Sequence, residues 1–344
     1  MRELALEHNF VVSLVPVSKE TPMFDPARLF AAAIRTAEVP GVNDDAMTVA
    51  LMRLKPNTDP YDRLEAWATD EASKGSLSTV FAALLWLIPR VGPEEHVRIA
   101  RFFGGGRLNA TVVKSWLRAH GAAKLFDVKP TREADLARQR LVFAPQLFAS
   151  VGLAGWCVLL DEVELIGRYS PLQRGRSYAE LGRWLGRDDK DPLPGITTVA
   201  AFTDDYVSQM FDDPKRRDEE RIPAILEQKG LARQSVLART FMRELRRGRG
   251  VRLAAPDEAA LSAAQTRIAD LYFAAYDWRP TDMAIGERRT TSSFRQYIKS
   301  WITRWDIERL YREEPTIESS TIRTDYTETI ELEQAGTDAK SDEE

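Results

Sequence analysis

The chain has 344 residues and a mass of 38.9 kDa, and 44% of its residues are hydrophobic and 29% charged, as in a globular protein of one large or two modest domains. Its 19 Gly and 18 Pro are close to average usage, which excludes collagen-like and low-complexity classes. One cysteine, Cys157, excludes an internal disulfide, and the wide spacing of His8, His96 and His120 excludes a Cys/His zinc motif. We therefore expect any metal to bind oxygen ligands.

The net charge of −4 is unevenly distributed along the chain. Residues 312–344 contain eleven Asp and Glu against three Lys and Arg, a local charge of −8, so the rest of the chain carries about +4. Because this segment is also poor in aromatic residues, we predict a disordered acidic tail over 312–344. The first residues lack the apolar core of a signal peptide, and no apolar run approaches the ~20 residues of a membrane-spanning helix. These features predict a cytoplasmic protein without a membrane partner.

The first predicted strand covers residues 10–17 (FVVSLVPV), an almost unbroken apolar run that suits a strand buried on both faces of a parallel sheet. Residues 2–8, which precede it, have the pattern of the last turns of a helix. A chain that opens on a helix end lacks the strand that normally precedes such a helix in a βαβ unit. We therefore expect the sheet to be incomplete at the N-terminus.

Helical periodicity dominates from about residue 25 to residue 150. Apolar residues recur at helical spacing around 29–37, 77–87, 97–103 and 112–117, and a cap-like start at 131–133 opens a further helix that runs to residue 148. The glycine triplet 104–106 lies between two of these segments and predicts a turn. This region is predicted to form a large helical insertion.

Two further strands are predicted at 156–160 (WCVLL) and 196–202 (ITTVAAF), with a helix at 178–185 between them. The remaining periodicity is helical, at 222–226, 231–245, 258–276 and 294–310. Strands separated by helices predict an α/β fold with a parallel sheet. We expect three regions: an α/β core over 1–210 that carries the insertion at about 25–150, a helical lid over 211–311, and the acidic tail over 312–344.

Asp161 and Glu162 directly follow the strand at 156–160. Because α/β sheets bind ligands at the carboxyl ends of their parallel strands, both carboxylates are expected at the binding edge. P-loop ATPases hold a Walker B pair there, in which the first acid orients a magnesium ion and the second polarises the attacking water. Asp161 is therefore the candidate Mg²⁺ and cofactor-binding residue, and Glu162 the candidate catalytic residue. The alternative is an acidic helix start that complements the helix dipole.

Thr203 and Asp204 follow the strand at 196–202. In the ATPase sheet, the strand beside Walker B ends in a sensor residue, often Thr or Asn, that bonds the γ-phosphate or the attacking water. Thr203 is the candidate sensor, a catalytic residue, and Asp204 is a second candidate, for cofactor binding. The alternative is that Thr203 caps the next helix.

The segments 10–35, 155–168, 174–186 and 267–278, together with the strand that ends at Thr203, resemble the ATP-binding P-loop protein of BREX-type phage-defence systems, a relative of the AAA and STAND ATPases. The likeness covers most of residues 10–310, and its most specific piece is LLDEVE at 159–164 followed by YAEL at 178–181. The resemblance implies an ATPase with a parallel sheet, a helical insertion and a helical lid. It also implies ATP and Mg²⁺ as cofactors, and work on or near DNA with defence-system partner proteins.

The segment 288–301 (RRTTSSFRQYIKSW) resembles the lid helix with which AAA-type ATPases offer an arginine to the nucleotide. The likeness implies Arg295 as a catalytic arginine and Arg289 as a cofactor-binding one.

One feature departs from this family. The 344 residues contain no Gly-x-x-x-x-Gly-Lys-Ser/Thr, the loop whose backbone N–H groups and lysine bind phosphate. In a family member this loop precedes the helix that ends near residue 8. One explanation is a chain that starts late, as a fragment or from an internal Met; the other is a degenerate ATPase. Under either explanation we expect this chain to bind ATP weakly or not at all.

Arginines crowd the segment 233–252, and four of them are candidates for nucleic-acid binding: Arg239, Arg243, Arg246 and Arg247. They could contact phosphates of DNA, or one could reach the γ-phosphate of a neighbouring subunit in an oligomer. The alternative is a solvated basic helix face. The chain is thus predicted to be an ATPase of a phage-defence system that lacks its phosphate-binding loop, or a non-catalytic ATPase-like module that docks DNA or proteins.

Overall fold

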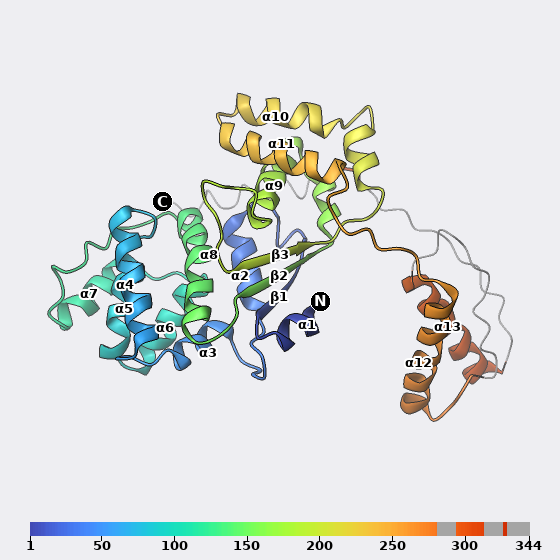
Figure 1. The fold of residues 1–344 in the computed structure, drawn as a ribbon, viewed down its shortest axis with the longest axis horizontal. Helices are drawn as coiled ribbons and strands as arrows, with labels where there is room; N and C mark the ends of the chain where they lie inside the picture. Colours follow the sequence, from blue (N-terminus) through green and yellow to red (C-terminus); the bar gives the residue numbers. More distant parts are fainter. Residues whose placement is uncertain (281–293, 313–325, 329–344) are drawn as a thin grey trace. The chain divides into compact units, whose positions relative to one another are not determined.

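The protein is described from a computed structural model that covers residues 1–280, 294–312 and 326–328 (Figure 1). The chain forms two compact units. The first contains Met1–Arg247 and the described residues 326–328, and the second contains the described residues between Gly248 and Asp325. The first unit therefore extends beyond residue 210, where the sequence pattern predicts the end of the α/β core.

The first unit is an α/β structure. Its strands are β1 (Val11–Pro16), β2 (Trp156–Asp161) and β3 (Ile196–Ala200). Its α-helices are α1 (Arg2–Glu7), α2 (Pro26–Arg35), α3 (Ala46–Arg53), α4 (Asp59–Lys74), α5 (Thr79–Leu87), α6 (Pro93–Phe103), α7 (Ala110–Ala119), α8 (Glu133–Ser150), α9 (Pro171–Trp184), α10 (Asp218–Gln228) and α11 (Ala232–Arg246). Single turns of other helix types cover η1 (Ile88–Arg90), η2 (Val163–Arg168) and η3 (Ser208–Asp212).

The three strands form one parallel sheet in the order β1-β2-β3, so β2 is central. Pro16 is in register with Asp161, and Leu160 with Ala200, so the carboxyl ends of all three strands lie at one edge. Each strand falls within a residue or two of its predicted position, and the α/β class with a parallel sheet is confirmed. Parallel strands require long crossovers, and here α2–α8 connect β1 to β2 while η2 and α9 connect β2 to β3.

One face of the sheet is packed, and Trp156, the first residue of β2, is a main contact of this face. Its ring lies edge-on to Phe30 of α2 and to Phe148 of α8, with centroids 6.0 and 5.9 Å away, and to Trp184 of α9 at 6.4 Å. The indole N–H donates to Ser13 Oγ of β1 at 2.8 Å, and that hydroxyl donates to a carbonyl of α2. This one side chain thus joins the amino end of the sheet to three helices.

The opposite face of the sheet is partly open. Leu14 of β1 is 46% exposed and Val199 of β3 is 37% exposed, and Leu159 lies between them in register. The prediction that the first strand is buried on both faces is therefore wrong at Leu14. Within the described part of the chain, no helix covers this row, although its residues are as apolar as those of the packed face.

The predicted helical insertion is present as α2–α8, and Figure 1 shows α3–α7 grouped beside α8. Its core contains a cluster of phenylalanines in which Phe103 and Phe143 have ring centroids 4.4 Å apart, and Phe81 lies 5.1 Å from Phe143. α6 ends at Phe103, so the glycine triplet 104–106 forms the predicted turn before α7.

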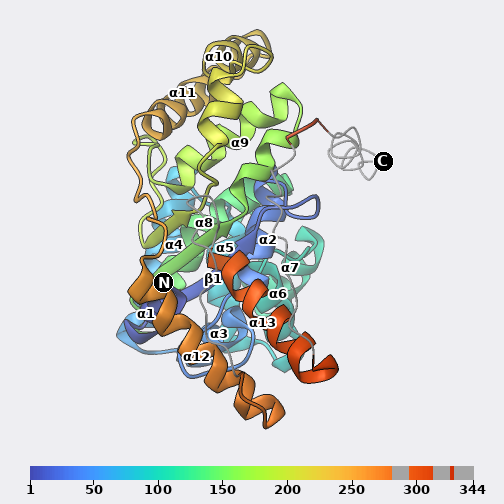
Figure 2. The same ribbon diagram turned by 90° about the vertical axis from the view of Figure 1, so that its right-hand side faces the viewer.

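Helices α9, α10 and α11 pack on one another and lie together in both views of the ribbon (Figures 1 and 2). This packing is why α10 and α11 belong to the first unit. The second unit consists of α12 (Glu258–Tyr276) and α13 (Phe294–Tyr311), which enclose a small core of their own around Trp301 and Trp305. None of the helices described has the length and apolar content needed to cross a bilayer.

Candidate functional site

Asp161 and Glu162 lie at the carboxyl edge of the central strand, and both are exposed. Glu162 adopts the left-handed conformation with φ 55° and ψ 32°, and its backbone N–H donates to Asp161 Oδ1 at 2.9 Å. A non-glycine residue in this region costs backbone energy and is often found at functional turns. The sharp turn ends β2 and projects two consecutive carboxylates at the sheet edge.

Further carboxylates gather around this turn. Glu164 is half-buried, and burial raises its pKa, with the negative charges of Glu162, Asp161 and Asp205 adding to the shift. These four acids come from the segments after β2 and β3, so the carboxyl edge has a negative local field. The sequence pattern identified the first pair, whereas Glu164 and Asp205 were not assigned a role.

These carboxylates are suitable ligands for a magnesium ion, but they do not form a complete coordination shell. Carboxylate oxygens are the ligands that Mg²⁺ prefers, and this ion usually keeps several waters and substrate phosphate oxygens. Among residues 1–280, 294–312 and 326–328, no group of three or more His, Cys, Asp or Glu is placed to hold a metal ion. An ion at Asp161 would therefore depend on oxygens supplied by a bound phosphate and by water.

Thr203 lies at the same edge, three residues after β3, and its side chain is engaged by Tyr326. The Thr203 Oγ1 and Tyr326 Oη atoms are 2.8 Å apart, and Tyr326 Oη donates to Asp205 Oδ1 at 3.0 Å. Because a tyrosine has one hydroxyl proton, Thr203 is the donor in its bond to Tyr326. The proton of the Thr203 hydroxyl is therefore used in the bond to Tyr326. Asp204 beside it is exposed.

A buried polar network lies behind Tyr326. Arg174 Nε and Nη2 donate to the two carboxylate oxygens of Asp218, each at 2.8 Å, and both side chains are 1% exposed. Tyr178 Oη donates to Asp218 at 2.7 Å and lies 2.9 Å from Tyr206 Oη. Burial raises the pKa values of both tyrosines well above their ordinary range, so both hydroxyls stay protonated at neutral pH. The network links α9, α10 and the segment after β3.

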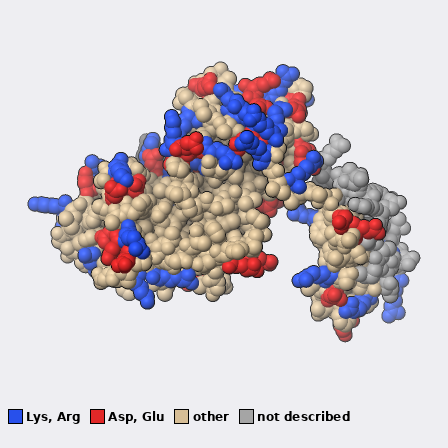
Figure 3. Space-filling model, in the orientation of Figure 1, with Lys and Arg blue, Asp and Glu red and all other residues tan. Residues whose placement is uncertain are grey.

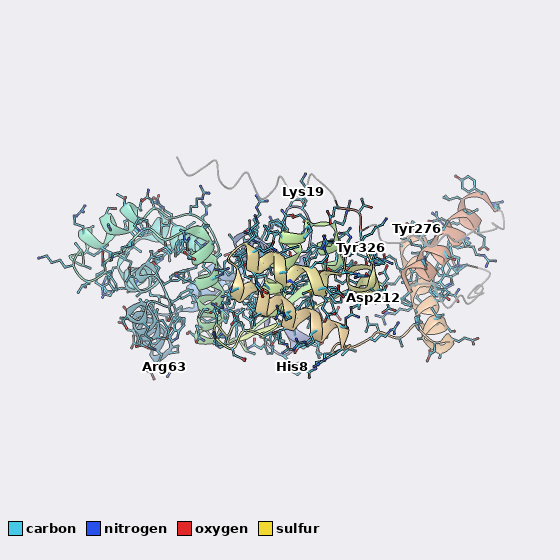
Figure 4. The ribbon with its side chains drawn as sticks, turned by 90° about the horizontal axis from the view of Figure 1, so that it is seen from above. His8, Lys19, Arg63, Asp212, Tyr276 and Tyr326 are labelled. Carbon is cyan, nitrogen blue, oxygen red and sulfur yellow. The ribbon has the colours of Figure 1, made fainter. Side chains whose placement is uncertain are left out.

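Glu328 extends this network to the surface. Its Oε1 accepts from Arg174 Nη1 and from Arg216 Nη1, each at 2.8 Å. Arg216 also donates to the backbone oxygens of Tyr326 and Gly167. Figure 4 labels Tyr326 among the side chains of the first unit. We name the residues that contact Tyr326 and Glu328 the tyrosine slot: Gly167, Arg174, Thr203, Asp205, Tyr206 and Arg216.

The predicted nucleic-acid arginines lie on α11 or just after it, among acidic side chains (Figure 3). Arg239 pairs with Glu227 at 3.1 Å, and Arg246 pairs with Asp212 at 2.9 Å and with Glu219. Arg243 and Arg247 are exposed and form no ion pair with another described residue. Two of the four candidates are thus already neutralised.

The predicted lid arginine Arg295 does not lie in the first unit. Arg295 is exposed in the first turn of α13, within the second unit, and Arg289 lies outside the described residues. Most of the predicted acidic tail lies outside the described residues as well. Of its described residues, Arg312 directly follows α13, and residues 326–328 contact the slot.

Of the slot residues, the sequence pattern predicts a role for Thr203 alone, and it assigns none to Glu164, Arg216 or Tyr326. One signal was available, because Tyr326 is the one aromatic residue in 312–344 and stands in an otherwise polar, acidic segment. Arg216 lies in a charged run (KRRDEE) that reads as a solvated surface. No protein-family model matches this chain, and neither the curated proteins nor the solved structures contain a significant match to it.

Proposed function

We propose that this chain is an ATP-binding protein that supports magnesium-dependent phosphate hydrolysis at the carboxyl edge of its sheet. The observation that carries the proposal is the position of Asp161 and Glu162, which end the central strand of a parallel sheet with Thr203 at the end of the next strand. α/β sheets bind ligands at this edge. The phage-defence setting rests on the resemblance in sequence alone.

Each residue has a role in the proposed reaction. Asp161 would hold Mg²⁺ together with phosphate oxygens, and the bound ion would stabilise charge on the phosphates. Glu162 would accept a proton from the attacking water, and Thr203 would donate its hydroxyl to the γ-phosphate or that water. Asp204 and the lid residues Arg289 and Arg295 complete the proposed set through the resemblance. Because no Gly-x-x-x-x-Gly-Lys loop neutralises the phosphates, binding of ATP should be weak.

The test is a comparison of Glu162→Gln with wild type in the presence of Mg-ATP. Loss of a general base lowers turnover by about 100-fold or more while nucleotide binding is kept. Asp161→Asn should weaken Mg-ATP binding. Glu94→Gln on α6 is the matched control, since it makes the same chemical change at an exposed site in the helical insertion. If the Asp161 and Glu162 variants bind and turn over Mg-ATP as the control does, the proposal is wrong.

A second function, that of a non-catalytic module that docks DNA, is supported by one observation. Arg243 and Arg247 are exposed and have no carboxylate partner among the described residues. Lysine and arginine contacts to phosphates give salt-dependent, sequence-independent binding. This function predicts nucleic-acid binding without any dependence on Asp161 or Glu162.

A further inference from the structure

The described residues Tyr326–Glu328 bind back onto the first unit through both of their ends. At one end, the Tyr326 hydroxyl lies between Thr203 Oγ1 at 2.8 Å and Asp205 Oδ1 at 3.0 Å. At the other end, the Glu328 carboxylate accepts from Arg174 and Arg216. The Tyr326 ring lies edge-on to Tyr206, with centroids 6.0 Å apart, and Tyr326 is 7% exposed. The segment therefore binds through two different kinds of contact: an aromatic ring with its hydroxyl at Tyr326, and a carboxylate at Glu328.

The guanidinium groups of Arg174 and Arg216 converge on one carboxylate, that of Glu328. Arg174 is 1% exposed and Arg216 is 14% exposed, whereas the buried acid beside them, Asp218, gives both of its oxygens to Arg174. Arg174 Nη1 donates to the Tyr169 carbonyl at 2.7 Å and Arg216 Nη1 to the Gly167 carbonyl at 3.3 Å, and both also donate to Glu328 Oε1 at 2.8 Å. A guanidinium that is largely removed from water requires a compensating anion. The slot is therefore built to receive a carboxylate at this position.

The aromatic position is equally specific. A Cβ atom added at Gly167 would lie 2.7 Å from Tyr326 Cδ1 and 3.1 Å from Met210 Sδ, so the ring fits only because residue 167 has no side chain. The hydroxyl of the ring meets one donor, Thr203, and one carboxylate acceptor, Asp205. Burial and the charge of Asp205 raise the pKa of Tyr326 to about 12, so the phenol is neutral and able to donate.

We propose that the tyrosine slot is a recognition site for an acidic Tyr-x-Glu peptide, and that Tyr326–Glu328 is its tethered occupant. While this segment is bound, the Thr203 hydroxyl is used by Tyr326, so the segment also blocks the edge at which a phosphate would bind. The recognition site is argued from the contacts above, whereas the blocking of nucleotide rests on the proposed function. Release of the segment would free Thr203, Asp205 and Arg216 together.

The test uses the full chain with Tyr326→Ala and Glu328→Gln, which remove the ring and the charge of the bound segment; we call this variant the emptied chain. The probe is a fluorescent peptide of residues 322–332 (IRTDYTETIEL). The emptied chain should bind this peptide at least tenfold more tightly than wild type, because a tethered segment competes at a high effective concentration. Peptides with Tyr326→Ala or Glu328→Gln should not bind. A matched control chain carries Tyr311→Ala with Glu308→Gln, a tyrosine and a glutamate of the second unit, and should behave as wild type.

Two further variants show where the peptide binds. In the emptied chain, Arg216→Gln should abolish peptide binding, whereas Arg63→Gln, an exposed arginine of α4, should not. Gly167→Ala should abolish it without a change of charge. The recognition site is overturned if the emptied chain binds the peptide no better than wild type, or if the Arg216 and Arg63 variants bind it equally.

Mg-ATP provides a separate readout of the blocking role. The emptied chain should bind Mg-ATP more tightly than wild type, and equal binding by both would overturn the block. If the peptide results are as expected and no chain binds Mg-ATP, the recognition site stands, and the proposed function and the block fail together.

Discussion

Two groups of arginines on the first unit are neutralised in different ways. On α11, Arg239 and Arg246 pair with acids on the surface, with side chains that are 48% and 40% exposed. In the tyrosine slot, Arg174 and Arg216 are removed from water and both pair with the partly exposed Glu328, and Arg174 also pairs with the buried Asp218. The arginines of α11 are close together in the sequence and form exposed ion pairs. The arginines of the slot are far apart in the sequence and form ion pairs that are largely removed from water. The density of arginines along a chain is therefore a poor guide to where it binds an anion.

The largest expected effect separates the two groups by stability. Asp218→Asn leaves the buried Arg174 without its bidentate partner and should lower the free energy of unfolding by about 3–5 kcal/mol. Asp212→Asn removes an exposed partner of Arg246 and should cost about 1 kcal/mol or less, because water screens that pair. Urea denaturation of both variants measures the difference. Equal losses would mean that the two groups are held alike.

A smaller effect is expected from the acids at the carboxyl edge. The pKa of Glu164 is raised in the folded protein, so the folded state holds the proton more tightly than the unfolded state does. Its contribution to stability therefore falls as the pH rises from its ordinary pKa of 4.5 through the raised value. Glu164→Gln should be more stable than wild type at pH 7, and the difference should shrink towards pH 4.

Urea denaturation of Glu164→Gln across this pH range is the measurement. The exposed Glu94→Gln variant serves as the control and should show no such pH-dependent gain. If Glu164→Gln is less stable than wild type at pH 7, the ionised Glu164 carboxylate is stabilised by a partner in the folded protein, and the expectation is wrong.

The smallest expected effect concerns nucleic acid. If α11 contacts DNA, Arg243→Gln with Arg247→Gln should reduce the slope of log affinity against log salt by about 2, since each phosphate contact contributes about 1. Arg239→Gln with Arg246→Gln should change it less, because these arginines already pair with acids. Gel shifts between ~50 and ~200 mM salt measure both slopes. An absence of binding at ~50 mM salt would exclude the DNA-docking function.

Local patterns predicted the elements well. The apolar runs around Val12, Val158 and Val199 predict three strands close to their observed limits, because a short apolar run between turns favours a strand. The acids after Leu160 were placed at the sheet edge correctly, since parallel strands share a direction. The exposure of Leu14 was not predictable, because burial of a strand's second face depends on what packs there and not on the strand's own residues.

The sequence by itself determined the α/β class, the helical insertion and the position of Asp161 and Glu162 at the end of a strand, since all three follow from periodicity and chain direction. Only the tertiary structure decided that Arg216 and Tyr326 join this edge. Arg174 and Glu328 are 154 residues apart and meet through long-range packing, which leaves no periodic trace in either segment. A site that is assembled from single residues of distant segments cannot be predicted from local sequence patterns. None of its residues differs in type from what is usual in its own segment, and only the fold brings them together.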